Sequence, residues 1–314
     1  MRGTKLRRGF TGTWVALLVL AGPATAAATS RHTSANTGLP KVTIEASKER
    51  EAVRREVDRF VGAVVVRPWD ETLSRWNDPI CPLVAGLPED FGEFILRDLS
   101  RAALEARAPL AGKVCHPNLY VVASGDPDLL LKKWWARNPG MYDTRHGLEP
   151  VRRFLESKRP VRVWYNSALG CGDGGPVVPG GSALAFAQVL TLGGGSSAFA
   201  PGITCTDGID THLSYADVRE ISSAIIVVNL RRLKPVSIQQ LADYIVLVGL
   251  ADVRLDADTR AAPSILWLFS GHAAPPSGLT LWDRALLYSL YNTRQRDKRQ
   301  VQDMEETMTG RIAP

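Results

Sequence analysis

The stretch that decides the fold is IIVVNLRRLKPVSIQQLADYIVLVGLAD, residues 225–252. Its first residues are apolar and mostly β-branched, which predicts a largely buried strand. Residues 231–235 are basic and end in proline, so the strand ends there. Ser237 then predicts a helix N-cap, with Gln240 completing a capping box, and Gly249 predicts a left-handed stop. The stretch therefore indicates a strand, a basic turn and a helix.

The N-terminus has the layout of a secretory signal peptide. Four basic residues precede an apolar run over residues 14–21, which is followed by small residues over 24–28. The alternative is an uncleaved membrane anchor, but the run is short for a span and Pro23 interrupts it. We expect a signal peptide over residues 1–26 and a flexible lead-in over 27–40. The mature protein would then be periplasmic or secreted and would have no transmembrane span.

The formal charge of +6 comes in large part from this leader. The leader holds four basic and no acidic residues, so its removal lowers the formal charge to +2. A charge this small gives no reason to expect nucleic acid as a partner.

The chain has four cysteines, Cys81, Cys115, Cys171 and Cys205. In an exported protein an even number favours disulfides, although four cysteines allow three connectivities. The two sequence-local pairs, Cys81–Cys115 and Cys171–Cys205, are the preferred pairing. A zinc site is the alternative, but no CxxC spacing is present.

Residues 41–295 show the strand and helix patterns of one α/β domain. We expect a strand over 41–45, a helix over 47–60 and a strand over 62–67. Thr280 predicts the N-cap of a final helix over 281–291, with Asp283 three residues later. Residues 296–314 are charged and show little apolar periodicity, which predicts a loosely held C-terminal tail.

The usual catalytic motifs are missing from the sequence. The five histidines are scattered, and the chain contains no HExxH, no GxSxG, no P-loop and no EF-hand loop. Glycine-rich segments near residues 172 and 193 are followed by neither Lys-Ser nor Lys-Thr, so they are weak candidates for a phosphate site. We therefore expect no cofactor and no metal.

One resemblance is carried by residues 222–291. The window from Ala242 to Asp252, read Ala242-Asp-Tyr-Ile-Val246-Leu-Val-Gly249-Leu-Ala-Asp252, is similar to the HExxHxxGxxH/D helix of the metzincins, particularly the matrixins. Residues 263–266, Pro-Ser-Ile-Leu, resemble that family's Ser-Ile-Met turn, and residues 279–291 resemble its closing helix. Over residues 41–295 the chain also resembles uncharacterised exported bacterial proteins.

The resemblance implies a metzincin-like mixed sheet with packed helices and a degenerate zinc site. Ala242 and Val246 stand at the first two histidine positions and offer no donor atom, so their helix face is expected to be packed core. Asp243 stands at the glutamate position and Asp252 at the third ligand position. We expect Asp243 and Asp252 to be the binding candidates.

Two functions are consistent with these features. The first is a non-catalytic exported domain that binds a protein, a peptide or an envelope component, for example by β-addition to residues 225–229 if they form a sheet edge. The alternative is a hydrolase with a relocated active site, built from Asp243, Asp252, His212 and Asp217.

Overall fold

The computed structural model describes residues 41–66, 73–144, 147–171, 177–179, 203–205, 217–233, 236–259, 262–272, 274–293 and 299–313. The chain divides into two compact units, residues 1–41 and 42–314, and the second contains the sheet. The predicted signal peptide and lead-in lie outside the described residues. No helix among the described residues is both long enough and apolar enough to cross a membrane.

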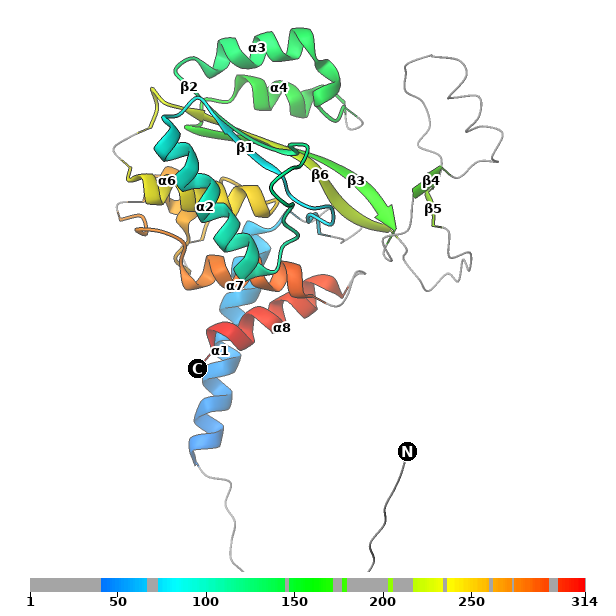
Figure 1. Cartoon of the computed structure of the whole chain (residues 1–314). Helices are drawn as coiled ribbons and strands as arrows, with labels where there is room; N and C mark the ends of the chain where they lie inside the picture. The colour runs from blue at the N-terminus through cyan, green and yellow to red at the C-terminus, as the bar shows by residue number, and fades with distance from the viewer. Residues whose placement is uncertain are drawn as a thin grey trace, which may run out of the picture. The chain divides into compact units, whose positions relative to one another are not determined.

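A four-stranded mixed sheet organises the fold (Figure 1). Its strands, in spatial order, are β1 (Pro82–Ala85), β2 (Leu119–Ser124), β6 (Asp217–Asn229) and β3 (Val161–Cys171). The first three run parallel to one another, and β3 runs antiparallel to β6. The prediction of a mixed α/β fold is confirmed.

Strand β6 lies inside the sheet, between β2 and β3. The possibility that residues 225–229 form a sheet edge is therefore wrong. Ile226 and Val228 contact the core on one face of the sheet, whereas Ile225 and Val227 belong to the cluster on the other face. A strand that is covered on both faces has a nearly continuous apolar sequence, as residues 224–228 do.

Two helices cover one face of the sheet (Figure 1). They are α3 (Pro127–Arg137) and α4 (Glu149–Glu156), joined through the short η1 (Pro139–Met141). Their apolar side chains pack with alternate residues of β2, β3 and β6. The buried members of this cluster are Leu131, Tyr142, Val151, Phe154, Ile225 and Val227.

The opposite face is covered by α2 (Glu89–Ala106) and α6 (Ile238–Leu250) (Figure 1). Helix α6 begins at the predicted capping box: Ser237 Oγ accepts a hydrogen bond from Gln240 N, and Gln240 Oε1 accepts one from Ser237 N. Nearly every α6 residue is buried, because the sheet, α2 and the C-terminal segments surround it.

The prediction that Gly249 stops α6 in a left-handed conformation is wrong. The helix continues through Leu250, and Gly249 has no positive φ. A Cβ atom at this position would lie 3.3 Å from Leu119 Cδ2 and 3.5 Å from Ile226 Cδ1. The glycine thus allows α6 to approach the sheet closely.

The predicted strands on either side of the helix over residues 47–60 are also wrong. Residues 41–45 and 62–64 belong to one long helix, α1 (Lys41–Val64), instead of two strands. Only Val65 pairs like a strand residue, in a single antiparallel bridge with Val253. The apolar residues that end the helix recur every three or four positions and point into the core together. They are Val57, Phe60, Val61 and Val64.

The chain after α6 passes through η2 (Ile265–Phe269) to α7 (Leu281–Asn292). The predicted capping box of α7 is present, since Thr280 Oγ1 accepts from Asp283 N and Asp283 Oδ2 accepts from Thr280 N. The same carboxylate accepts hydrogen bonds from Ser264 Oγ and Ile265 N. Asp283 therefore ties the start of α7 to η2.

The C-terminal residues are not a loose tail. Residues 300–312 form α8 (Gln300–Ile312), which packs against α7. Met304 and Met308 are fully buried, and Gln300 Oε1 accepts a hydrogen bond from Leu73 N at 2.9 Å. The helix has few apolar residues among many charged ones, so its local pattern did not predict an amphipathic helix.

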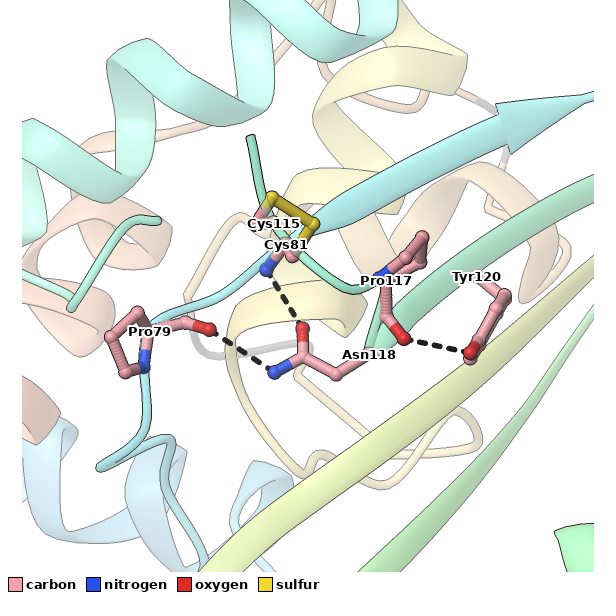
Figure 2. The surroundings of a disulfide bond; sticks show 6 residues. All are labelled: Pro79, Cys81, Cys115, Pro117, Asn118 and Tyr120. Carbon is pink, nitrogen blue, oxygen red and sulfur yellow. Dashed lines mark hydrogen bonds between the residues drawn. A yellow bond between two sulfur atoms is a disulfide. The ribbon is translucent and has the colours of Figure 1, made fainter. Parts of the chain in front are cut away.

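The predicted disulfide between Cys81 and Cys115 is present. Figure 2 shows that it lies beside Asn118, whose side chain accepts a hydrogen bond from Cys81 N and donates one to Pro79 O. The start of β1 is thereby tied to the start of β2.

The second predicted pair, Cys171 and Cys205, stands at the ends of two strands. Cys171 ends β3, and Cys205 ends the short β5 (Ile203–Cys205), which pairs with β4 (Val177–Pro179). The side chains of both cysteines lie outside the described residues, so this disulfide stays a prediction.

Candidate functional site

The two helix positions that would carry zinc-binding histidines in a metzincin are packed core. Ala242 and Val246 are fully buried, as predicted. They share one helix face with Gly249, which lies against Leu119 and Ile226 of the sheet. This face offers no nitrogen or oxygen ligand from its side chains.

Asp243 points toward α2, where it meets a second aspartate. Gln239 Nε2 donates hydrogen bonds to Asp243 Oδ2 at 2.8 Å and to Asp98 Oδ2 at 3.2 Å. Both carboxyl groups are buried, at 2% exposure for Asp243 and 4% for Asp98. A Cβ atom at Gly278 would lie 2.4 Å from Asp243 Oδ2, so the chain after η2 packs directly against Asp243.

The environment of this pair favours a protonated Asp98. Burial, the hydrogen bond with Asp243 and the negative charge of Asp243 together raise the pKa of Asp98 to about 6. Arg101, whose Nη2 donates to Asp98 Oδ1, and Gln239 act in the opposite direction. The two carboxyls can share one proton across the α2–α6 contact. Nothing in the sequence around Asp98 had indicated this partner.

Asp252 lies in a different environment. It lines a small cavity of about 10 Å³ beside Ser74, among apolar residues of α7, α8 and the chain after α1. Burial outweighs the opposing effects of a hydrogen bond from Ser74 and the charge of Arg219, and the pKa of Asp252 is raised to about 6. Asp243 and Asp252 do not share a binding partner.

The end of α6, next to Asp252, is closed by three aromatic donors. Trp76 Nε1 donates to Gly249 O at 2.8 Å, Tyr165 Oη to Val248 O at 2.6 Å, and Tyr291 Oη to Leu250 O at 2.6 Å. These carbonyls would otherwise lack partners at the helix end. The geometry at this position therefore serves to terminate the helix. The donors come from three distant parts of the chain, so the sequence did not reveal them.

The side chains of the other two residues in the relocated-site hypothesis, His212 and Asp217, fall outside the part of the chain that the structure describes. Asp217 is described only as the first backbone position of β6. Among the described residues, no group of three or more His, Cys, Asp or Glu side chains could hold a metal ion.

The outer edge of β3 is the strongest binding feature. Asn229 N donates to Pro160 O at 2.8 Å, and the β3–β6 register continues regularly to Asn166. In an antiparallel pair the hydrogen-bonded positions alternate, so the backbone groups of Val161, Val163 and Tyr165 point away from β6. Within the described part of the chain, no residue pairs with these groups. Val161 is only 1% exposed, whereas Val163 and Tyr165 are partly exposed, so the accessible part of this edge begins at Val163.

The opposite edge of the sheet differs in length and chemistry. Strand β1 spans only Pro82–Ala85. Cys81 O accepts from Leu119 N, so the next residue, Pro82, faces outward and has no N–H to offer. A short edge that carries a proline is poorly suited to pairing with another strand. Of the two edges of the sheet, the β3 edge is therefore better suited to pairing with another strand than the β1 edge.

A cavity of about 310 Å³ lies where β3 begins. Pro160 precedes the strand and lines this cavity together with Phe269 of η2, Arg232 of the β6–α6 turn, and His272. The His272 ring stacks on Trp267 at a centroid distance of 4.3 Å. The cavity thus adjoins the open edge and combines apolar walls with cationic or hydrogen-bonding groups.

Comparison with protein-family models, with curated proteins and with solved structures finds no match to this chain. The features that bear on its function are the β3 edge, the neighbouring cavity and helix α6, whose residues Ala242 and Val246 offer no zinc ligand.

Proposed function

We propose that this chain is an exported, non-catalytic protein with a metzincin-like domain, and that it binds an extended segment of a protein, peptide or envelope component along β3. The order β6, α6, η2 and α7 agrees with the arrangement that the resemblance implies. The disulfide Cys81–Cys115 supports a location in an oxidising compartment.

The observation that carries the proposal is the open edge of β3. An extended peptide can add to such an edge through main-chain hydrogen bonds, and alternate side chains then contact the surface beside it. Val163 and Tyr165 supply two partly exposed outward positions before the irregularity between Asn166 and Ser167, whereas the outward position at Val161 is buried. The matching edge at β1 is shorter and carries Pro82.

The absence of peptidase chemistry is supported by α6. Ala242 and Val246 pack against the sheet without donor atoms, so Asp252 alone would have to hold a zinc ion at this position. The alternative of a hydrolase with a relocated site has less support, because Asp243 and Asp252 lie among different partners.

The test uses a mixed pool of synthetic octapeptides, half with free and half with amidated carboxyl termini. Enriched peptides are identified by mass spectrometry, and their Kd values are measured by fluorescence anisotropy. Val163→Pro removes one outward N–H and leaves the β3–β6 ladder intact. We expect this variant to bind at least about tenfold more weakly, which corresponds to one or two hydrogen bonds.

Val163→Thr is the matched control, because it keeps the N–H and the β-branched shape. It should bind as the wild type does. Circular dichroism verifies that both variants are folded. If no peptide is enriched, or if Val163→Pro binds as well as Val163→Thr, the β3 edge is not the binding site and the proposal is wrong.

A further inference from the structure

We propose that the cavity at the start of β3 captures the carboxyl terminus of the bound peptide and encloses its apolar last side chain. This inference rests on the proposed function and names the chemistry of the ligand. It joins three observations, namely the position of the cavity, its apolar walls and its charges.

The first observation is the position of the cavity along the strand. Antiparallel pairing is slightly more stable per residue than parallel pairing. A peptide that runs antiparallel to β3 has its carboxyl end at the beginning of β3. Pro160 stands immediately before that strand and lines the cavity. A peptide that pairs with Val163 and Tyr165 therefore directs its last residues past the buried Val161 toward the cavity.

The second observation is the apolar character of the walls. Val236, Leu268 and Phe269 line the cavity and are only partly buried. Leu268 and Phe269 come from η2, and Val236 comes from the chain just before α6. A volume of about 310 Å³ lies at the lower end of the range of small-ligand pockets and suits one side chain with its carboxylate.

The third observation is the charge around the mouth of the cavity. Arg232 is exposed, and its guanidinium donates a hydrogen bond from Nη1 to Lys158 O at 3.2 Å. A guanidinium has five N–H donors, so others remain for a carboxylate. His272 lies on the same cavity, and no acidic residue lines it.

Helix α6 adds to this preference for an anion. It begins beside the cavity, and its first turn contains no acidic residue. The positive end of the helix dipole is therefore not neutralised by its own side chains. Gln240 also lines the cavity, but its amide is engaged with Ser237 and Pro276, so it positions the turn and leaves the carboxylate to Arg232 and His272.

A second cavity, of about 380 Å³, shares Gly271 and His272 with the first. It is lined by Asp256 and Asp258, and Asp256 forms an ion pair with Arg159 at 3.6 Å. Two carboxylates disfavour a peptide carboxylate on that side. The charge difference between the two cavities therefore assigns the chain end to the cavity that holds Arg232.

The test compares peptides enriched from the octapeptide pool, each synthesised as the free acid and as the amide. Fluorescence anisotropy measures both Kd values with the wild-type protein. We expect the free acid of peptides with an apolar last residue to bind at least about tenfold more tightly, as one charge-assisted pair allows. Arg232→Gln should bring the acid-to-amide ratio close to one.

Arg231→Gln is the matched control, since Arg231 is exposed in the same turn and does not line the cavity. It should keep the wild-type ratio. If acid and amide bind equally while Val163→Pro still weakens both, carboxylate capture is wrong and binding at the β3 edge stands. If residue 163 has no effect on either form, the proposed function itself is wrong. An unchanged ratio in Arg232→Gln, with the wild type preferring the acid, would also overturn the assignment to this cavity.

Discussion

At the level of single residues, the aspartate pair at the α2–α6 contact is the most unusual feature. Two carboxyl groups with almost no exposure meet between helices, where Gln239 donates to both and Arg101 donates to Asp98. Asp243 Oδ1 is buried without a hydrogen-bond partner. A buried carboxylate of this kind lowers stability unless a proton neutralises the pair.

The pair predicts a pH dependence of stability. The pKa of Asp98 in the folded state is about 6, above the value of about 4 expected in the unfolded chain. Between these values the folded state binds more protons, so the free energy of unfolding falls as pH rises from about 4 to about 6. In Asp98→Asn, this decrease in the free energy of unfolding should be smaller by about 2 kcal/mol.

Urea unfolding at pH 4.5 and pH 7 measures this difference. Part of the dependence should remain in Asp98→Asn, because the pKa of Asp252 is also raised to about 6. Asp90→Asn changes an exposed carboxylate of the same helix and serves as the control. Equal pH dependence in the wild type and in Asp98→Asn would contradict the shared-proton interpretation.

At the level of elements, helix α6 depends on side chains from elsewhere for its final turn. Trp76, Tyr165 and Tyr291 donate to three successive carbonyls, those of Gly249, Val248 and Leu250. The donors lie on a loop, a strand and another helix. The end of α6 is thus a point at which separate parts of the fold meet.

Tyr291→Phe tests this arrangement. The variant keeps the ring but leaves Leu250 O without its donor, so the free energy of unfolding should fall by about 1–3 kcal/mol. Tyr288→Phe is the control on the same helix, because Tyr288 contacts Arg107 and Arg311 through its ring, which phenylalanine retains. Chemical denaturation of both variants gives the comparison. A Tyr291→Phe variant as stable as Tyr288→Phe would show that the hydroxyl contributes nothing.

At the level of the whole molecule, α8 completes the hydrophobic core. Met304 and Met308 are fully buried, Val301 nearly so, and Gln300 satisfies the backbone N–H of Leu73. Met304 also closes the small cavity beside Asp252. The C-terminal segment therefore contributes to the same core as the sheet and α7.

Deletion of residues 299–314 should strongly destabilise the protein. Three buried apolar side chains are lost, each worth about 1.5–3 kcal/mol, so the loss is on the order of 5 kcal/mol. Deletion of residues 313–314 alone is the control and should have little effect. Thermal unfolding followed by circular dichroism measures both. A similar melting temperature for the two truncations would restore the view that this segment is loosely held.

The sequence by itself determined the features whose signals are local. The strand and helix within residues 225–250, the capping boxes at Ser237 and Thr280, and the apolar character of Ala242 and Val246 all follow from residue types at short spacing. The pairing of Cys81 with Cys115 was also predicted correctly, because proximity in the chain favours it.

The tertiary structure alone decided the features that depend on distant partners. The interior position of β6, the partner of Asp243 on α2, and the cavity at Arg232 each join segments far apart in the chain. The extension of α1 and the burial of α8 also depend on the core that those helices meet. Local patterns determine whether a segment forms a helix or a strand. Where that element packs depends on the free energy of burying it against distant parts of the chain.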